Sequence, residues 1–102
     1  MMLTQAALNN MRNHLRYTIG YAQYKVDGVY YRADIQNTQV LADGRVEITF
    51  LINHTAPGSI TITEVQLYDQ NGVLFASKPE QITRISTQEG ILYRFRFTIT
   101  EI

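Results

Sequence analysis

Short turn dipeptides constrain this chain more than any other feature of its sequence. Asp27-Gly28, Asp43-Gly44 and Asn71-Gly72 each interrupt a stretch rich in β-branched and aromatic residues. Asp-Gly and Asn-Gly suit the tight turns of β-hairpins, because those turns need positive φ angles at their central positions. Beyond Gly20 the chain is therefore expected to form short antiparallel strands. We place seven of them at residues 21–26, 29–35, 45–53, 60–69, 73–77, 81–85 and 91–101.

Within the longest of these strands apolar and polar residues alternate, which indicates sheets with one buried face. The even-numbered residues from 46 to 52 and the odd-numbered residues from 91 to 99 are all apolar or aromatic. In the strand at 60–69 the alternation shifts by one residue near Thr63-Glu64, which predicts a β-bulge. Pro79 is unsuited to a central strand, so we expect separate strands on either side of it, with 81–85 at an edge. The pattern predicts a mainly β fold, an antiparallel β-sandwich of about seven strands.

One amphipathic helix is expected before the strands, over residues 4–17. Ala7, Leu8, Met11 and Leu15 recur at intervals of three and four residues, the helical period. The hydroxyl of Thr4 is placed to cap the free amides of the first turn. So short a helix is marginal alone in water, and we expect its apolar stripe to be covered by another part of the structure.

Size and charge limit the classes of protein to which the chain can belong. The 102 residues suit a single domain over 1–102, with the helix at about 4–17 and the β-sandwich at about 20–101. Nine basic residues balance nine acidic ones, so no basic field exists to bind nucleic acid, and self-association meets little net repulsion. No signal peptide or membrane span is evident, which predicts a soluble protein made in the cytoplasm.

Residues that could support catalysis or metal binding are few and scattered. The chain has no cysteine, and its two histidines, His14 and His54, have no metal-ligand spacing around them. We interpret His54 as a loop residue that bonds to local backbone. Glu64, at the expected bulge, is interpreted as a half-buried acid bonded to backbone amides or to Arg94 or Arg96. The sequence thus predicts no enzyme, no cofactor and no metal, and an active site built from Glu64 and His54 is the weakest of the alternatives.

Arg94 and Arg96 share one face of the last strand, between aromatic residues. Two cations so placed could bind an anion or phosphate. The alternative that we favour is a polar sheet face on which these arginines pair with carboxylates across the strands.

Tyrosine is concentrated in the N-terminal third of the chain. Five of the seven tyrosines are Tyr17, Tyr21, Tyr24, Tyr30 and Tyr31. Adjacent residues of a strand point to opposite faces, so at least one of the last two is expected outside the core. Core packing and contact between helix and sheet are expected to explain most of them, but all five are interface candidates, and a sugar-stacking surface is the third interpretation. Replacing Tyr24 or Tyr30 with Ala is then expected to dissolve an assembly and leave the monomer folded.

Several segments of the chain, taken together, carry a resemblance to a known family. They are Leu3-Thr4 and Ala7-Leu8, Tyr31-Arg32 with Ile35, the strand at 46–52, and a hairpin with Glu64, Leu67, Tyr68, Asp69, Gly72, Leu74 and Ala76. In this order, over about the first 80 residues, the chain resembles the N-terminal domain of phage tail-collar fibre proteins. It departs from that family at Gln66, where a Gly is usual, and in its shorter segment between the helix and Tyr31.

The resemblance implies a structural role in a phage or prophage tail or baseplate, through contacts with other tail subunits. It also implies a homo-oligomer, with a trimer favoured, and a location in the virion tail after assembly. The alternative function is a carbohydrate-binding β-sandwich module that stacks sugar rings on exposed tyrosines and so has a glycan as its partner. The sequence predicts neither nucleic acid nor membrane as a partner.

Overall fold

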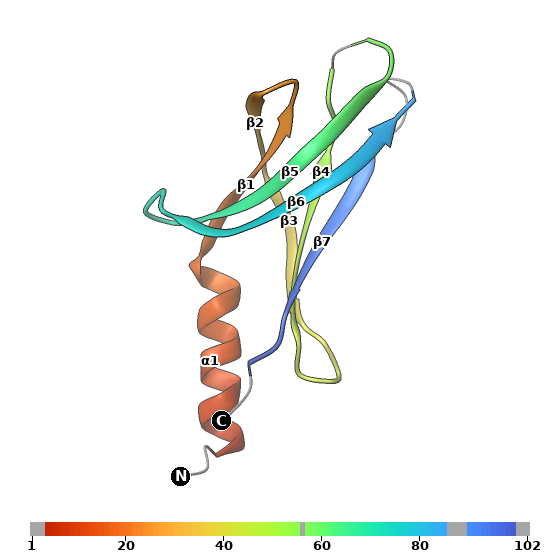
Figure 1. Cartoon of the computed structure of the whole chain (residues 1–102). Coiled ribbons are helices and arrows are strands. Elements are labelled where there is room, and N and C mark those ends of the chain that lie inside the picture. The colour runs from red at the N-terminus through yellow and green to blue at the C-terminus, as the bar shows by residue number, and fades with distance from the viewer. Residues whose placement is uncertain (1–3, 56, 86–89, 100–102) are drawn as a thin grey trace.

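A computed structural model describes residues 4–55, 57–85 and 90–99 of the chain, which form one helix and two antiparallel sheets (Figure 1). The elements are α1 (Gln5–Thr18), β1 (Ile19–Val26), β2 (Val29–Ala33), β3 (Ile35–Val40), β4 (Val46–Ile52), β5 (Ile60–Asp69), β6 (Leu74–Arg84) and β7 (Ile91–Phe97). Sheet A has the strand order β2-β1-β5-β6, and sheet B has the order β3-β4-β7. This arrangement confirms the prediction of a mainly β sandwich with one N-terminal helix.

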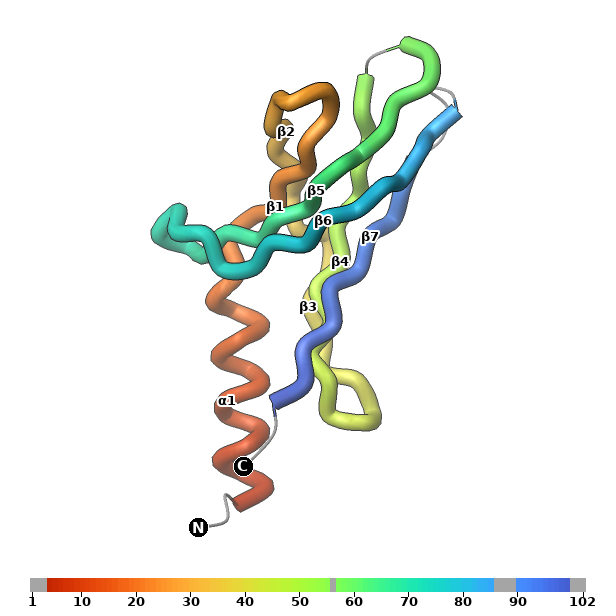
Figure 2. The backbone as a smooth tube through the Cα atoms, in the orientation of Figure 1, coloured from red at the N-terminus to blue at the C-terminus, as the bar shows by residue number. Residues whose placement is uncertain are grey.

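The helix begins where the sequence predicts it. The Thr4 hydroxyl accepts a hydrogen bond from the amide of Ala7 at 3.1 Å and caps the first turn. At its other end α1 runs directly into β1, so it leaves sheet A as a projection beside the lower part of sheet B (Figure 2). Arg16 docks it there by donating to the Thr38 hydroxyl at 3.4 Å and to the Thr38 carbonyl at 3.1 Å.

The first hairpin also forms as predicted, but its second strand is shorter. Asp27 and Gly28 have φ angles of 51° and 79°, and Val26 pairs with Val29 across the turn. The prediction of one strand over 29–35 is wrong, because β2 ends at Ala33 and the chain then crosses to sheet B as β3. The crossing places Ile35 and Val40 against the buried core, which continuation along β1 would not do.

The predicted bulge lies at Thr63. On β1, Lys25 pairs with Glu64 but the next residue, Val26, pairs with Ile62, so Thr63 has no partner of its own. Against β6 the register also changes between Ile62 and Glu64, but there the pairs Ile62–Ile82 and Glu64–Pro79 put the extra residue on β6. On β5, the extra residue keeps Ile62 and Val65 on the buried face of the sheet.

The strand β6 is one continuous edge strand, and the expected division into 73–77 and 81–85 is wrong. Pro79 lies within it, opposite Glu64 and next to the bulge. A proline is tolerated there because an edge strand leaves one row of backbone groups outside the ladder. With β2 and β3 separate and β6 undivided, the strand count is still seven.

The inner faces of the two sheets form one core. Val46, Ile48, Phe50 and Ile52 are buried from sheet B, and Ile62, Val65 and Leu67 from sheet A. Tyr93 and Phe95 of β7 are buried beside Phe50, as the alternation predicts. The last predicted strand ends at Phe97 instead of continuing through residue 99, and its residues 100–101 lie outside the described part of the chain.

Deleting Thr63 is expected to destabilise the fold by about 3 kcal/mol or more, because removal of the extra residue turns Ile60 and Ile62 away from the core. Urea denaturation followed by circular dichroism measures this difference. Thr63→Ala, which keeps the residue count, is the control and is expected to stay within about 0.5 kcal/mol of the wild type. Equal stability of the deletion variant would contradict the register assigned to the bulge.

Candidate functional site

The five tyrosines predicted as interface candidates do not lie together on one surface. Tyr24 is only 5% exposed and belongs to the core. Tyr31 stacks on it with ring centroids 5.6 Å apart and keeps one side open to solvent. Tyr21 and Tyr30 lie on the outer face of sheet A, and Tyr17 projects from the end of α1 with 65% of its surface exposed. The expectation that Tyr24→Ala leaves the monomer intact therefore does not fit its burial.

Around Tyr24 the core contains a polar cluster that includes His54. The Tyr24 hydroxyl and Nδ1 of His54 are 3.0 Å apart, and the Tyr31 ring lies edge-on to the His54 ring with centroids 4.5 Å apart. Burial is the main cause that raises the pKa of Tyr24. We expected His54 to bond to local backbone, but its ring instead bonds to the side chain of Tyr24, which is distant in the sequence.

Arg84, a residue that the sequence analysis did not single out, ties this cluster to the loop between β4 and β5. Its side chain is 1% exposed and donates to the backbone carbonyls of His54 and, at 3.3 Å, Gly58. The one feature of the sequence that could have pointed to Arg84 is its position two residues after Ile82, which puts both on the same face of the strand. Both pair with buried isoleucines of β5. These contacts give Arg84 a structural role in holding the loop.

Glu64 lies on the outer face of sheet A and is surrounded by hydrogen-bond donors. Its carboxylate accepts from Ser77 at 2.6 Å, Tyr30 at 2.7 Å and Gln66 at 2.9 Å. These bonds, with that from Ser77 the largest contribution, lower the pKa of Glu64 below its ordinary value. Glu64 is half-buried as expected, but its partners are side chains of its own sheet.

The arginines proposed as partners of Glu64 belong to the other sheet. Arg96 donates to Glu47 at 2.8 Å on sheet B, in the cross-strand pairing predicted for that face, and Arg94 pairs with Thr49 in the ladder. Glu64 and His54 are not brought together either, because the first faces outward from sheet A and the second lies within the core.

Aromatic rings on the outer face of sheet A are already covered by neighbouring side chains. Tyr21 and Tyr68 stack at 5.0 Å with ring planes 4° apart, and the Arg32 guanidinium lies 4.1 Å from the Tyr21 centroid. Because β1 lies between β2 and β5, these two neighbours approach Tyr21 from opposite sides. Lys25 in turn lies 5.3 Å from the ring centroid of Tyr30.

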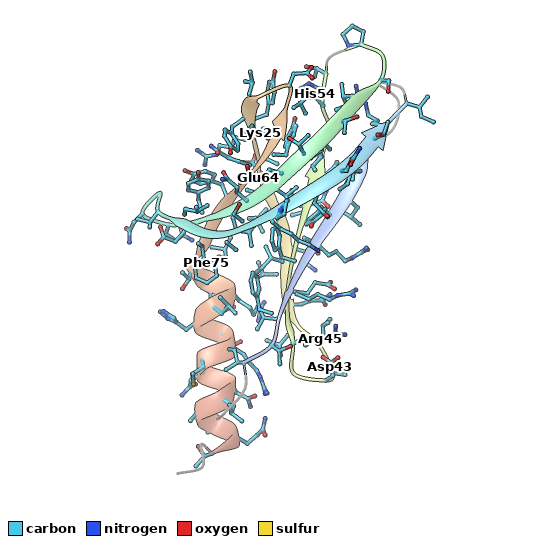
Figure 3. All side chains as sticks on the ribbon, viewed as in Figure 1. Lys25, Asp43, Arg45, His54, Glu64 and Phe75 are labelled. Atoms are coloured by element: carbon cyan, nitrogen blue, oxygen red, sulfur yellow. The ribbon has the colours of Figure 1, made fainter. Side chains whose placement is uncertain are left out.

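An apolar groove of about 650 Å³ separates α1 from the ends of the sheets. It is lined by Asn10, Met11, His14, Leu15, Thr18, Phe75 and Ile99. Figure 3 shows Phe75, a residue of β6, beside the upper end of the helix. The hairpin is fastened to the helix by Gln70, whose backbone N–H donates to the Thr18 carbonyl at 2.9 Å.

Large apolar side chains are exposed on α1 and on the β5–β6 hairpin, and two of them, Met11 and Phe75, line this groove. They are Met11 and Tyr17 of the helix and the successive residues Val73, Leu74 and Phe75 of the hairpin, which together we call the helix–hairpin surface. All fourteen residues of α1 are described, and none is buried. The apolar stripe of the helix, which we expected to be covered by another part of the structure, is therefore only partly covered. The three successive apolar residues after Asn71-Gly72 were the sequence signal for this surface, because an alternating strand with one buried face would not place three apolar residues in a row.

Within the described ranges, no three His, Asp or Glu side chains are grouped to hold a metal ion, and no helix has the length and apolar character to cross a membrane. No model of a known protein family matches the chain, and comparisons with curated proteins and with solved structures find no significant similarity. The resemblance to tail-collar fibre proteins stays a prediction that rests on the residues of its motif.

Replacing Glu64 with Gln is expected to make the free energy of unfolding less dependent on pH in the acidic range. A carboxylate with a lowered pKa stabilises the fold above its ordinary value of about 4.3 and loses that contribution as the pH falls and it becomes protonated. Wild type is thus expected to exceed Glu64→Gln in free energy of unfolding at neutral pH, with the difference closing below about pH 4. Urea titrations at a series of pH values measure it, and a difference that is constant with pH would contradict the assigned bonds.

Tyr24→Ala is expected to lower the free energy of unfolding by about 3–5 kcal/mol, as for other buried aromatic residues cut to Ala. Tyr17→Ala is the exposed control and is expected to change it by less than about 0.5 kcal/mol. Both are measured by urea denaturation at a low protein concentration. Similar small changes in both variants would be incompatible with the burial of Tyr24.

Proposed function

We propose that this protein is a non-catalytic assembly subunit that works through protein–protein contacts at the helix–hairpin surface. The observation that carries the proposal is the groove beside α1, which is apolar, open and flanked by exposed Met11 and Phe75. Exposed apolar surface of this kind is typical of a contact site for another macromolecule. The separation of Glu64 from His54 further favours a binding role over catalysis.

A phage or prophage tail or baseplate is the assembly that we propose, with its other subunits as partners. The support is the Glu-x-x-Leu-Tyr-Asp-x-x-Gly-x-Leu-x-Ala motif, which corresponds to the β5–β6 hairpin. Asp69 closes the turn by accepting from the amides of Asn71 and Val73, both at 2.9 Å. The most specific part of the resemblance thus builds the hairpin that presents Leu74 on the helix–hairpin surface. In this setting the chain is made in the bacterial cytoplasm and becomes part of the virion tail.

Carbohydrate binding has less support as the function. Sugar rings stack on open aromatic faces, whereas Tyr21 is flanked by Tyr68 and Arg32, and Tyr31 packs against Tyr24. The hydroxyl of Tyr30 is engaged by Glu64. A glycan would have to displace contacts that the chain already makes, which favours a protein partner.

Particles purified from a lysate of the bacterium that carries the gene test the proposal. Mass spectrometry is expected to find the chain in the tail fraction of a density gradient. Met11→Glu, which places a charge in the groove, is expected to reduce the particle-bound share at least tenfold, whereas Leu92→Glu is expected to leave it unchanged. The control is matched, because Met11 and Leu92 are each 45% exposed and Leu92 lies on sheet B.

Absence of the wild-type chain from the particles would contradict the proposed setting. Equal loss of both variants would contradict the assignment of the contact to the helix–hairpin surface. Thermal unfolding of the purified variants serves as the check that both are folded.

A further inference from the structure

We propose that a cleft between α1 and the β3–β4 hairpin binds a phosphate group. The cleft consists of two adjoining hollows of about 380 and 350 Å³, which share Asn9 and Val40. We call it the basic cleft, and the polar residues that define it are Asn9, Arg12, Asn13, Arg16, Gln39 and Asp43. None of these residues lines the apolar groove, so the site goes beyond the proposed assembly contact.

The helix sequence carries the pattern Asn-x-x-Arg twice in succession, as residues 9–12 and again as residues 13–16. Residues three apart are neighbours on a helix surface, and a shift of four residues repeats the pair about one turn further along nearly the same side. Nη1 of Arg12 donates to Oδ1 of Asn9 at 3.3 Å. Nη1 of Arg16 bonds in the same way to Asn13, at 3.5 Å. Two cations are thus held in successive turns along the basic cleft.

Arg12 is a partly buried cation that forms no ion pair within the described residues. Its guanidinium packs over Gly44, where a Cβ would lie 2.7 Å from Nη2 of the arginine. The guanidinium therefore occupies the space that a side chain at this turn position would take. Nε of Arg12 is buried and has no acceptor in the part of the chain that the structure describes. A desolvated guanidinium without a counter-charge costs free energy, and a bound anion would offset that cost.

The acids beside the basic cleft are engaged by other arginines. Asp43 accepts from Nε of Arg45 at 2.8 Å and from the backbone amide of Arg45 at 3.1 Å (Figure 3). Glu47, which pairs with Gln39 in the ladder, accepts from Nε of Arg96 at 2.8 Å. The basic cleft therefore keeps a positive charge, because neither acid is bonded to an arginine of the helix.

The two asparagines leave hydrogen-bond donors for a ligand. Oδ1 of Asn9 accepts from Gln5 at 3.2 Å as well as from Arg12, and Oδ1 of Asn13 accepts from Arg16, so the Nδ2 groups of both asparagines are left to donate. Cations combined with donors select an anion that is rich in acceptor oxygens. Because these groups come from successive helical turns, a tetrahedral phosphate fits them better than a planar carboxylate. A cleft of this volume also has room for a small organic group attached to the phosphate.

NMR titration of the ¹⁵N-labelled full-length chain with inorganic phosphate, at an ionic strength held constant with sodium chloride, tests the site. Saturable shifts are expected for the side-chain amides of Asn9 and Asn13 and for Nε–H of Arg12. Acetate is expected to bind at least tenfold more weakly, because it offers a single charge and two oxygens in one plane. Glycerol phosphate distinguishes the source of the group: tighter binding than that of inorganic phosphate would assign the site to an organic phosphate, and equal or weaker binding to the free ion.

Three variants locate the site. Arg12→Gln is expected to weaken phosphate binding at least tenfold. Asn9→Asp places a carboxylate beside Arg12 and is expected to abolish binding without loss of folding, since the new acid supplies the counter-charge within the chain. Arg94→Gln is the matched control, because it removes an exposed arginine of sheet B that forms no ion pair with any described residue. Phosphate is expected to raise the thermal midpoint of wild type and of Arg94→Gln and to leave that of Asn9→Asp unchanged.

Absence of saturable shifts in the wild-type chain would overturn the proposal. Unchanged binding by Asn9→Asp, or a loss in Arg94→Gln as large as that in Arg12→Gln, would overturn the assignment to the basic cleft. Acetate that binds as tightly as phosphate would overturn the choice of ligand.

Discussion

Burial of the inner faces of β4 and β5 is the constraint on which the rest of the structure depends. β4 is the central strand of sheet B, and β5 lies between β1 and β6 in sheet A. Phe50 and Ile48 of the first and Ile62 and Leu67 of the second are fully buried. Each such side chain contributes about 1.5–3 kcal/mol when it leaves water. Every other strand pairs with one of these two, except β2, which is attached through β1.

Polar residues on the outer face of sheet A form a second level of organisation. Tyr30, Gln66 and Ser77 donate to Glu64, so this exposed face is occupied by bonds within the chain. The helix–hairpin surface differs in kind, because Met11, Leu74 and Phe75 have no polar groups with which to bond one another. This contrast directs the proposed assembly contact to the helix end of the molecule and away from the tyrosine-rich face.

The local features of the chain were predictable in detail. Thr4 caps the helix, Asp27 and Gly28 adopt positive φ angles, and Thr63 is the extra residue of the bulge, all as the sequence indicates. Each depends on residues within a few positions of one another. The two predictions that were wrong, for the strand that passes Ala33 and for the strand that contains Pro79, depended on the sheet to which each strand belongs. The chain leaves sheet A after Ala33 because β4 offers a pairing edge in sheet B. Pro79 is tolerated because β6 has a neighbouring strand on one side only.

For the residues of the candidate site, too, local features were predictable from the sequence and long-range partners were not. The Tyr24 and Glu64 environments needed partners at a distance of about 30 residues along the chain, His54 and Tyr30, which no periodicity reveals. The sequence by itself determined which segments are extended, the hairpin turns, the helix and the inner faces of the long strands, because side-chain alternation and turn chemistry act over short separations. Only the tertiary structure decided that Tyr24 is buried, that Arg84 holds a loop and that the stripe of α1 borders an open groove. These outcomes depend on how the two sheets and the helix pack against one another, which brings together residues that are far apart in the sequence.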